Sequence, residues 1–273
     1  MRTDPSLRLP PGEAVTPDRA GWRYLSFAVL DVAAPVLVGG PGVETAVVSL
    51  AGGAFSVGDL SIPGRSSVWE GLPSGVYLPP GVAATITPVG EFVTVAVANA
   101  PASGRATADR PVRIGPEDIR VEVRGAGNAT RQINHIIAPD FPADRLEVVE
   151  VYTPSGNWSS WPPHKHDTDD IPREAVLEEV YSYRFRRPEA WGIQRLYRAD
   201  GSRDLLWAVR EGETVLVTDG YHPFVATHGD DAYYLNALAG DHRTMACSFD
   251  PNLASVMDAW PSMEADPRVP LVR

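Results

Sequence analysis

Two histidines separated by one residue, His164 and His166, are the first chemical signal in the sequence. On a β-strand, residues i and i+2 point to the same side, so the two imidazoles would project together. Neutral imidazoles are suitable ligands for Zn, Fe, Ni or Mn. Pro162 and Pro163 favour an extended entry into such a strand. Because a pair of this kind often holds no metal, further ligands are needed to predict a metal site.

A carboxylate could supply the third ligand. Glu178 and Glu179 are adjacent on a predicted strand, 177–185, so only one of them can face inward. If Glu179 faces inward, Tyr181 and Tyr183 do so too, which would place aromatic side chains beside it. The alternative is an ordinary pair of solvent-exposed glutamates.

A fourth candidate, His222, follows a short predicted strand, 214–217, and a Thr-Asp-Gly turn. It could equally be a turn histidine beside a proline. Taken together, the histidine pair, a strand glutamate and this histidine suggest a site with three imidazoles and one carboxylate. Such a ligand set leaves positions open for a substrate, as a catalytic metal requires.

The histidines are distributed unevenly along the chain. Residues 1–134 contain none, and the six that exist occur at positions 135, 164, 166, 222, 228 and 242. A first-half domain therefore cannot hold a histidine-based metal site. We expect one half to be a structural partner and the other to carry the chemistry.

The elements that must position these residues are strands. Short runs rich in β-branched and aromatic residues alternate with segments rich in glycine and proline, which is typical of an all-β sandwich or barrel. The predicted strands are 44–50, 83–89, 92–98, 145–153, 178–185, 193–198, 214–218 and 231–238. The best helix candidate is 250–260, and residues 1–20 are expected to form an extended arm. A polar, proline-containing segment beginning near residue 101 predicts a connection between two β domains.

Composition excludes several classes of protein. The chain has 273 residues, 44% of them hydrophobic, which is enough for a sizeable core, and its net charge of −11 argues against a nucleic-acid partner. The single cysteine, Cys247, rules out an intramolecular disulfide and fits a reducing compartment. We find neither a secretory signal nor a run of about 20 apolar residues, so we expect a cytoplasmic protein with no membrane partner.

Several motifs resemble the 5-deoxy-glucuronate isomerase family of myo-inositol breakdown, whose relatives include the ketol-isomerase of the pectin pathway. The segments that carry the resemblance are SVWEGLPSGVYLPPG (67–81), GNWSSWPPHKHD (156–167), LEEVYSYRF (177–185), GIQRLY (192–197), GYHPF (220–224) and YYLNALAG (233–240). The resemblance implies a bicupin, with two double-stranded β-helix (jelly-roll) barrels in one chain. Residues 1–118 would form a degenerate N-terminal barrel without a metal site, and residues 119–273 a C-terminal barrel that carries the metal.

The same resemblance implies an activity and a ligand set. The activity is a metal-dependent aldose–ketose isomerisation of 5-deoxy-D-glucuronate to 5-dehydro-2-deoxy-D-gluconate. The implied ligands of one divalent metal ion are His164, His166, Glu179 and His222, with Zn or Mn as the first choice and Fe or Ni as alternatives. The competing hypothesis is another metal cupin enzyme with the same ligands, either a dioxygenase or an isomerase of a different uronate.

The remaining candidates are assigned by chemistry and position. Tyr183 and His228 could move protons as catalytic residues, whereas Gln194 and Asn236 could only bind the substrate through hydrogen bonds. The partner would be a small sugar acid, and the chain is expected to form a homo-oligomer. The substrate carboxylate calls for an arginine, and the arginines near the motifs are Arg173, Arg184, Arg195 and Arg198.

Two features depart from the family pattern. The gap between His166 and Glu179 is long and is filled by the segment DTDDIPREAVL. Thr218 and Asp219 precede Gly220, where the family usually has proline in a Val-Pro context. Since proline would pre-set the turn, its absence predicts a looser loop and an altered substrate preference.

Overall fold

The first half of the chain forms two antiparallel sheets. The computed structural model describes residues 3–273, and its five-stranded sheet has the order β10-β7-β4-β9-β2, while a four-stranded sheet has the order β3-β8-β5-β6. The strands are β2 (Ser26–Val32), β3 (Val36–Gly39), β4 (Val43–Gly52), β5 (Phe55–Val57), β6 (Leu60–Ile62), β7 (Gly75–Leu78), β8 (Ala83–Pro88), β9 (Val93–Pro101) and β10 (Val112–Ile114).

The second half repeats this plan with additions. A seven-stranded sheet has the order β1-β19-β16-β21-β13-β12-β11, a four-stranded sheet the order β14-β20-β17-β18, and β15 pairs with β22. The strands are β1 (Arg8–Leu9), β11 (Arg120–Arg124), β12 (Arg131–Ile137), β13 (Leu146–Thr153), β14 (Trp158–Ser159), β15 (His164–Lys165), β16 (Leu177–Phe185), β17 (Trp191–Tyr197), β18 (Asp204–Arg210), β19 (Thr214–Val217), β20 (Phe224–Ala226), β21 (Ala232–Gly240) and β22 (Ser248–Phe249). The predicted strands are therefore present, and the fold is all-β.

The two halves have the same strand order. Reading across the larger sheets, β7-β4-β9-β2 corresponds to β19-β16-β21-β13, and in the smaller sheets β3-β8-β5-β6 corresponds to β14-β20-β17-β18. The correspondence extends to the edge, where β10 pairs with β7 and β1 pairs with β19. The N-terminal strand thus completes the second half, so sheet membership does not follow chain order.

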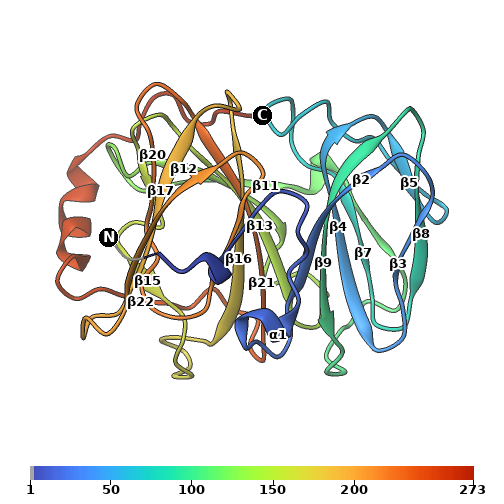
Figure 1. Ribbon diagram of the computed structural model, residues 1–273, viewed down its shortest axis with the longest axis horizontal. Coiled ribbons are helices and arrows are strands. Elements are labelled where there is room, and N and C mark those ends of the chain that lie inside the picture. The colour runs from blue at the N-terminus through green and yellow to red at the C-terminus, as the bar shows by residue number, and fades with distance from the viewer. Residues whose placement is uncertain (1–2) are drawn as a thin grey trace.

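Successive side chains on the central strands point to opposite faces of the sheet, so these strands contribute to two separate hydrophobic cores. On β9, the valines at positions 93, 95 and 97 face the core between the two sheets of the first half. The alanines at positions 96, 98 and 100 face the opposite way and join the larger core, which continues through the second half. β21 likewise presents Ala237 and Ala239 to that core. Small side chains on both central strands let the two larger sheets lie side by side (Figure 1).

The ends of the chain differ from the sequence prediction. The N-terminal segment is docked rather than extended, with a 3₁₀ turn (Pro5–Leu7), β1 and a short helix α1 (Pro17–Ala20), and Leu7, Leu9 and Val15 are buried. The predicted helix at 250–260 exists as a 3₁₀ helix, Ala254–Ser262. No helix in the described part of the chain is long and apolar enough to cross a membrane.

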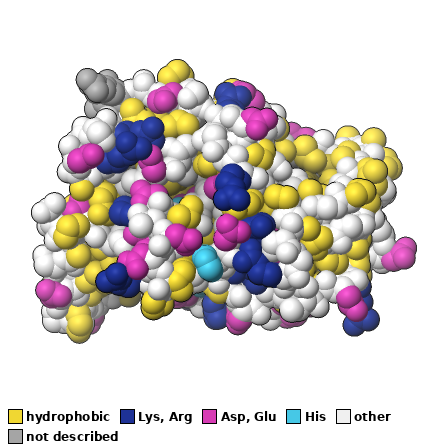
Figure 2. All heavy atoms as spheres, turned by 90° about the horizontal axis from the view of Figure 1, so that it is seen from below, with side chains coloured by type: hydrophobic (Ala, Val, Ile, Leu, Met, Phe, Trp, Pro, Cys, Tyr) yellow, Lys and Arg dark blue, Asp and Glu magenta, His cyan; other side chains and the backbone are white. Residues whose placement is uncertain are grey.

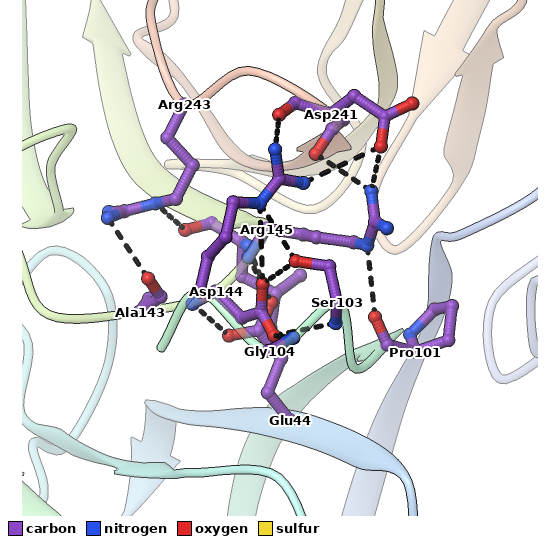
Figure 3. A network of polar contacts seen from close by, with 12 residues as sticks. Glu44, Pro101, Ser103, Gly104, Ala143, Asp144, Arg145, Asp241 and Arg243 are labelled. Carbon is purple, nitrogen blue, oxygen red and sulfur yellow. Dashed lines mark hydrogen bonds and ion pairs between the residues drawn. The ribbon is translucent and has the colours of Figure 1, made fainter. Parts of the chain in front are cut away.

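Two glutamates fasten the halves together. Both Glu44 on β4 and Glu178 on β16 are the second residue of corresponding strands. The Glu44 carboxylate accepts hydrogen bonds from the backbone N–H groups of residues 144, 145 and 146, at 2.6–2.8 Å, just where β13 begins (Figure 3). The Glu178 carboxylate accepts from those of residues 23, 24 and 25, at 2.6–2.9 Å, just before β2. Each half therefore holds the entry to the other half's sheet.

Side chains complete this junction. The guanidinium of Arg145 lies 4.2 Å from the ring centroid of Tyr24, and its Nη1 lies 2.5 Å from Asp241 Oδ1. The Tyr24 hydroxyl donates to Asp241 as well, at 2.7 Å. Deeper in the interface, Arg65 of the first half forms a buried ion pair with Glu150 of the second, at 2.7 Å. The junction is thus a set of directed polar contacts set into an apolar interface.

The face of the molecule seen in Figure 2 carries charges of both signs. Figure 2 shows a face on which basic and acidic side chains are interleaved, with hydrophobic side chains gathered over one end. Many of the surface arginines are paired with carboxylates, as Arg195 is with Asp204 at 2.8 Å. This face therefore carries no continuous basic stripe of the kind that binds nucleic acid.

Replacing Glu178 with alanine is expected to lower the free energy of unfolding by about 3 kcal/mol, because three backbone donors lose their acceptor. Urea unfolding of the metal-free protein measures the change. The exposed Glu189→Ala is the matched control and should stay within about 0.5 kcal/mol of the parent protein. Equal stability of the two variants would show that the Glu178 contacts do not hold the N-terminal segment.

Candidate metal centre

Three side chains from separate segments converge inside the second half. The Glu179 Oε2 atom lies 2.9 Å from His166 Nε2 and 3.4 Å from His222 Nε2. One ligand atom from each of the three residues lies within 4.8 Å of the others, and all three residues are buried. The geometry is that of a group able to hold one metal ion.

His164 is the fourth member of the cluster. Its ring centroid lies 4.7 Å from that of His222 and 6.4 Å from that of His166. It is presented by β15, where it is registered against Phe249 of β22. Lys165 between the two histidines turns toward Asp167 and Glu174 instead, which are 2.6 and 2.8 Å away. Alternation on this short strand thus separates the imidazoles from the lysine.

The hydrogen bonds of the Nδ1 atoms in His166 and His222 determine which ring nitrogen keeps a lone pair that faces the cluster. His166 Nδ1 lies 2.9 Å from the carbonyl oxygen of Leu177, and His222 Nδ1 lies 2.9 Å from that of Gly220. When Nδ1–H donates to a carbonyl, the Nε2 lone pair is left for a metal. His222 Nε2 is buried and has no hydrogen-bond partner among the described residues. An orphaned nitrogen of this kind fits a metal ligand.

The electrostatics of the cluster favour neutral imidazoles at two positions. Burial, together with the neighbouring imidazoles, lowers the pKa of His164 and of His222 to about 3 in each case. Burial also opposes the charge on His166, but the hydrogen bond and charge of Glu179 outweigh it and raise the pKa of that residue. Glu179 thus favours the protonated form of His166 in the metal-free protein, and a divalent ion bound there would take the place of that proton.

The cluster opens onto a cavity of about 410 Å³. Three of the four candidate ligands, His164, His166 and Glu179, line it, together with polar side chains and an apolar rim supplied by the C-terminal segment. The residues that line it, besides the ligands, include Arg124, Arg131, Ser160, Trp161, Tyr181, Tyr234, Asn236, Met245, Cys247, Phe249, Met257 and Trp260. A cavity of this size accommodates a small organic substrate next to the ligand set.

The structure separates the other predicted site residues. Asn236 lines the cavity, and its Nδ2 donates to the Val180 carbonyl at 3.1 Å. Tyr183 and Gln194 are buried outside the cavity lining, where the Tyr183 hydroxyl donates to Gln194 Oε1. The Gln194 amide in turn donates to the His222 carbonyl at 2.7 Å. His228 is exposed on a loop and is not part of the cavity wall.

The four arginines predicted as candidates for the substrate carboxylate do not line the cavity, and each is paired with a carboxylate of the protein. The partners of Arg173, Arg184 and Arg195 are Asp170, Glu211 and Asp204, respectively. Arg198 is paired with Asp219. The described arginines that line the cavity are Arg124 and Arg131, which precede the histidine pair in sequence and belong to none of the motifs. The signal that could have found them is the Gly-rich turn between them, since a hairpin there pairs the two positions.

The departures from the family pattern are accommodated locally. Asp219 forms ion pairs with Arg203, at 2.6 Å, and with Arg198, and it is not part of the cavity wall. Asp167, in the long segment after His166, accepts from the Gly220 N–H at 2.7 Å. Gly220 has φ +79°, and a Cβ there would lie 2.5 Å from the Tyr197 carbonyl oxygen. The inserted segment and the glycine thus fix the turn that presents His222.

A buried acid without a hydrogen-bond partner, Glu147, was not predicted from the sequence. Glu147 is fully buried, and neither of its carboxylate oxygens has a hydrogen-bond partner among the described residues. On the seven-stranded sheet it lies opposite Leu238, which in turn lies opposite Glu179, so the two acids share one cross-strand row. Burial raises the pKa of Glu147 to about 7, despite the nearby charges of Arg243 and His166.

Comparison with known proteins shows which family and which solved structures this chain resembles. The chain matches the KduI/IolB family over residues 11–256. It is 40% identical over 258 residues to a 5-deoxy-glucuronate isomerase of Geobacillus kaustophilus, covering 90% of each chain. An IolB-like protein of Salmonella typhimurium has a similar structure, with a TM-score of 0.84 and 34% identity over 90% of this chain and 94% of that one. A Bacillus subtilis oxalate decarboxylase described with Mn(II) centres has a TM-score of 0.58 at 12% identity, covering 89% and 76%.

The fold and site therefore define a cupin-like β protein with a buried group able to bind a metal ion. Within that class, the chain belongs to the KduI/IolB family. It is an isomerase.

The carboxyl of Glu147 is expected to make stability fall as pH rises. Its pKa in the folded protein, about 7, exceeds the ordinary value of 4.5, so the neutral form stabilises the fold at low pH. This stabilisation is lost as pH rises through 7. Between pH 5 and pH 8 the metal-free parent protein should lose about 2 to 3 kcal/mol relative to Glu147→Gln. Urea unfolding at both pH values measures this, and parallel pH profiles of the two proteins would contradict it.

Proposed function

We propose that this isomerase is metal-dependent and converts 5-deoxy-D-glucuronate to 5-dehydro-2-deoxy-D-gluconate in myo-inositol breakdown. The observation that carries the proposal is the convergence of His166, Glu179 and His222, with an orphaned His222 Nε2, beside a cavity that His166 and Glu179 line. The names of the relatives supply the substrate, since those 36–40% identical to this chain are 5-deoxy-glucuronate isomerases.

The ligand set would consist of His164, His166, Glu179 and His222. One divalent ion held there would supply a Lewis acid for the substrate carbonyl. Three imidazoles and a carboxylate suit Zn or Mn as the first choice, and Fe or Ni as alternatives. The isomerisation moves one proton between neighbouring carbons and another between their oxygens, so the site also needs hydrogen-bonding groups that hold both oxygens.

The polar wall of the cavity offers such groups. Tyr181 stands two residues after Glu179 on the same face of β16, and its hydroxyl is 2.8 Å from Ser160 Oγ. Burial raises its pKa well above the ordinary value, so it remains a neutral hydrogen-bond donor at physiological pH. Asn236 is its cross-strand partner. We assign Tyr181 and Asn236 to holding the substrate oxygens, and the Tyr183–Gln194 pair to positioning His222 from behind.

The apolar rim has a separate task. Met245, Phe249, Met257 and Trp260 close one side of the cavity. Seated there, they would exclude water from an enediolate intermediate and limit loss of the migrating proton to solvent.

We further propose that the repeated strand order reflects two double-stranded β-helix barrels, a bicupin, of which only the second binds metal. In the first half, the segment that corresponds to the histidine pair is only the short 40–42 turn between β3 and β4, and Thr45 takes the place of Glu179 as the third residue of its strand. No histidine occurs before residue 135. The partner would be a small sugar acid, and the assembled form a homo-oligomer.

The test combines metal analysis with an NMR assay of 5-deoxy-D-glucuronate under nitrogen. The parent protein should contain about one equivalent of metal and isomerise the substrate without oxygen. His222→Ala should bind metal at least tenfold more weakly, because an inner ligand is lost, and should lose turnover. The exposed His242→Ala, which lies outside the cavity wall, is the matched control and should keep both properties.

Each failure has a distinct meaning. Metal without anaerobic turnover, but with oxygen uptake, would favour the dioxygenase alternative. Metal with turnover of another uronate would correct the substrate alone. A metal-free parent protein whose isomerase activity is indifferent to chelators would overturn the metal dependence.

A further inference from the structure

Arg131 is a buried cation at the wall of the cavity. It is the first residue of β12, and only 6% of its surface is exposed. Its Nη1 donates to the carbonyl oxygens of Ala129, at 3.1 Å, and Trp161, at 3.0 Å. These two carbonyls fix the position of the guanidinium but do not neutralise its charge.

Arg131 forms no ion pair within the described residues 3–273. Glu122, whose charge acts on Arg131, is already engaged, because it binds Arg124 through two hydrogen bonds of 2.7 and 3.0 Å and lies 2.9 Å from His135. Burial lowers the pKa of Arg131 to about 10, so it is still charged at neutral pH. A buried charge without a partner is costly unless a ligand supplies the opposite charge.

The cavity is electropositive in a protein that is acidic overall. Arg124 and Arg131 line it, but Arg124 is paired with Glu122, so Arg131 is the cation in the wall without an acid partner. Glu179 is the only carboxylate among the described residues that line the cavity. A metal ion bound to Glu179 would leave the cavity still more positive. Because the chain as a whole carries a net charge of −11, a buried cation without an acid partner beside the candidate metal ligands marks a site for an anion.

The local backbone holds the arginine rigidly. Arg124 and Arg131 are directly opposed across the β11–β12 hairpin, and the turn between them begins at Gly125. Gly125 has φ +86°, and a Cβ there would lie 2.1 Å from the Ala129 carbonyl oxygen and 2.9 Å from Arg131 Nη1. The tight turn therefore brings the guanidinium against the backbone and pre-organises it for a ligand.

We propose that Arg131 binds the carboxylate of the substrate and makes the cavity selective for sugar acids over neutral sugars. This assignment rests on the proposed function and specifies which residue reads the acid group. The planar guanidinium suits a carboxylate because it offers parallel N–H donors. Arg124, half-exposed and held by Glu122, lies on the same wall as a secondary positive charge.

The test measures binding of two stable probes to the metal-loaded protein by titration calorimetry. D-glucuronate carries the carboxylate, and D-glucuronamide replaces it with a neutral amide. Arg131→Gln should weaken D-glucuronate binding by about 10- to 100-fold, the usual effect of losing a charge-assisted pair. Arg131→Lys should fall in between, and neither variant should change D-glucuronamide binding more than about twofold. Arg120→Gln, an exposed arginine on the same hairpin, is the matched control.

Metal content and thermal unfolding separate this role from a structural one, because both should be unchanged in Arg131→Lys even if Arg131→Gln folds poorly. Equal D-glucuronate affinity in the parent protein and both variants would overturn the assignment, as would equal losses for the acid and the amide.

The assignment and the proposed function fail separately. Turnover of 5-deoxy-D-glucuronate with an unchanged KM in both variants would reject only the role of Arg131. Arg131-dependent binding of D-glucuronate without turnover would reject only the reaction.

Discussion

The structure depends on the alternation of side chains along β16, which sends two adjacent carboxylates to opposite faces of one sheet. Glu179 faces the interior, where it meets His166 and His222. Glu178 faces the first half of the chain and accepts three backbone hydrogen bonds from the segment that leads into β2. A slip of one residue in the register of this strand would exchange the two faces, and both the metal ligands and the junction between the halves would be lost. The positions of the candidate metal ligands and the junction between the two halves therefore both depend on the alternation of side chains along β16.

The repeated strand order explains how one half can support the other. Glu44 on β4 performs for the second half what Glu178 on β16 performs for the first, so the two halves clamp one another reciprocally. The first half has strands that correspond to those of the candidate metal site but lacks the ligand side chains. Thr45, for example, occupies the strand position that Glu179 occupies in the second half. It supplies a sheet whose strands β4 and β9 contact β13 of the second half. The second half can then keep polar atoms such as the Glu147 carboxylate oxygens and His222 Nε2 buried without a hydrogen-bond partner among the described residues.

Much of this was accessible from local sequence patterns. Alternation of apolar and polar residues reflects the two faces of a strand, so the eight predicted strands coincide with β4, β8, β9, β13, β16, β17, β19 and β21. The histidine count located the chemistry in the second half. The prediction of an extended N-terminal arm was wrong. The burial of Leu7 and Leu9 depends on the pairing of β1 with β19, which lies more than 200 residues later in the chain. Likewise, the helix near the C-terminus adopts 3₁₀ geometry.

The sequence by itself determined the strands, the absence of histidine ligands from the first half and the set of candidate ligands, because these follow from residue type and period. Only the tertiary structure decided which polar side chains share the cavity. It placed Arg131 in the cavity wall beside the candidate ligands and Tyr183 outside that wall, although Tyr183 belongs to one of the sequence motifs and Arg131 to none. It also carried His228 out to solvent. The reason is physical: the side on which a strand residue faces is a local property, whereas the neighbours it meets there depend on sheet order, which pairs segments from distant parts of the chain.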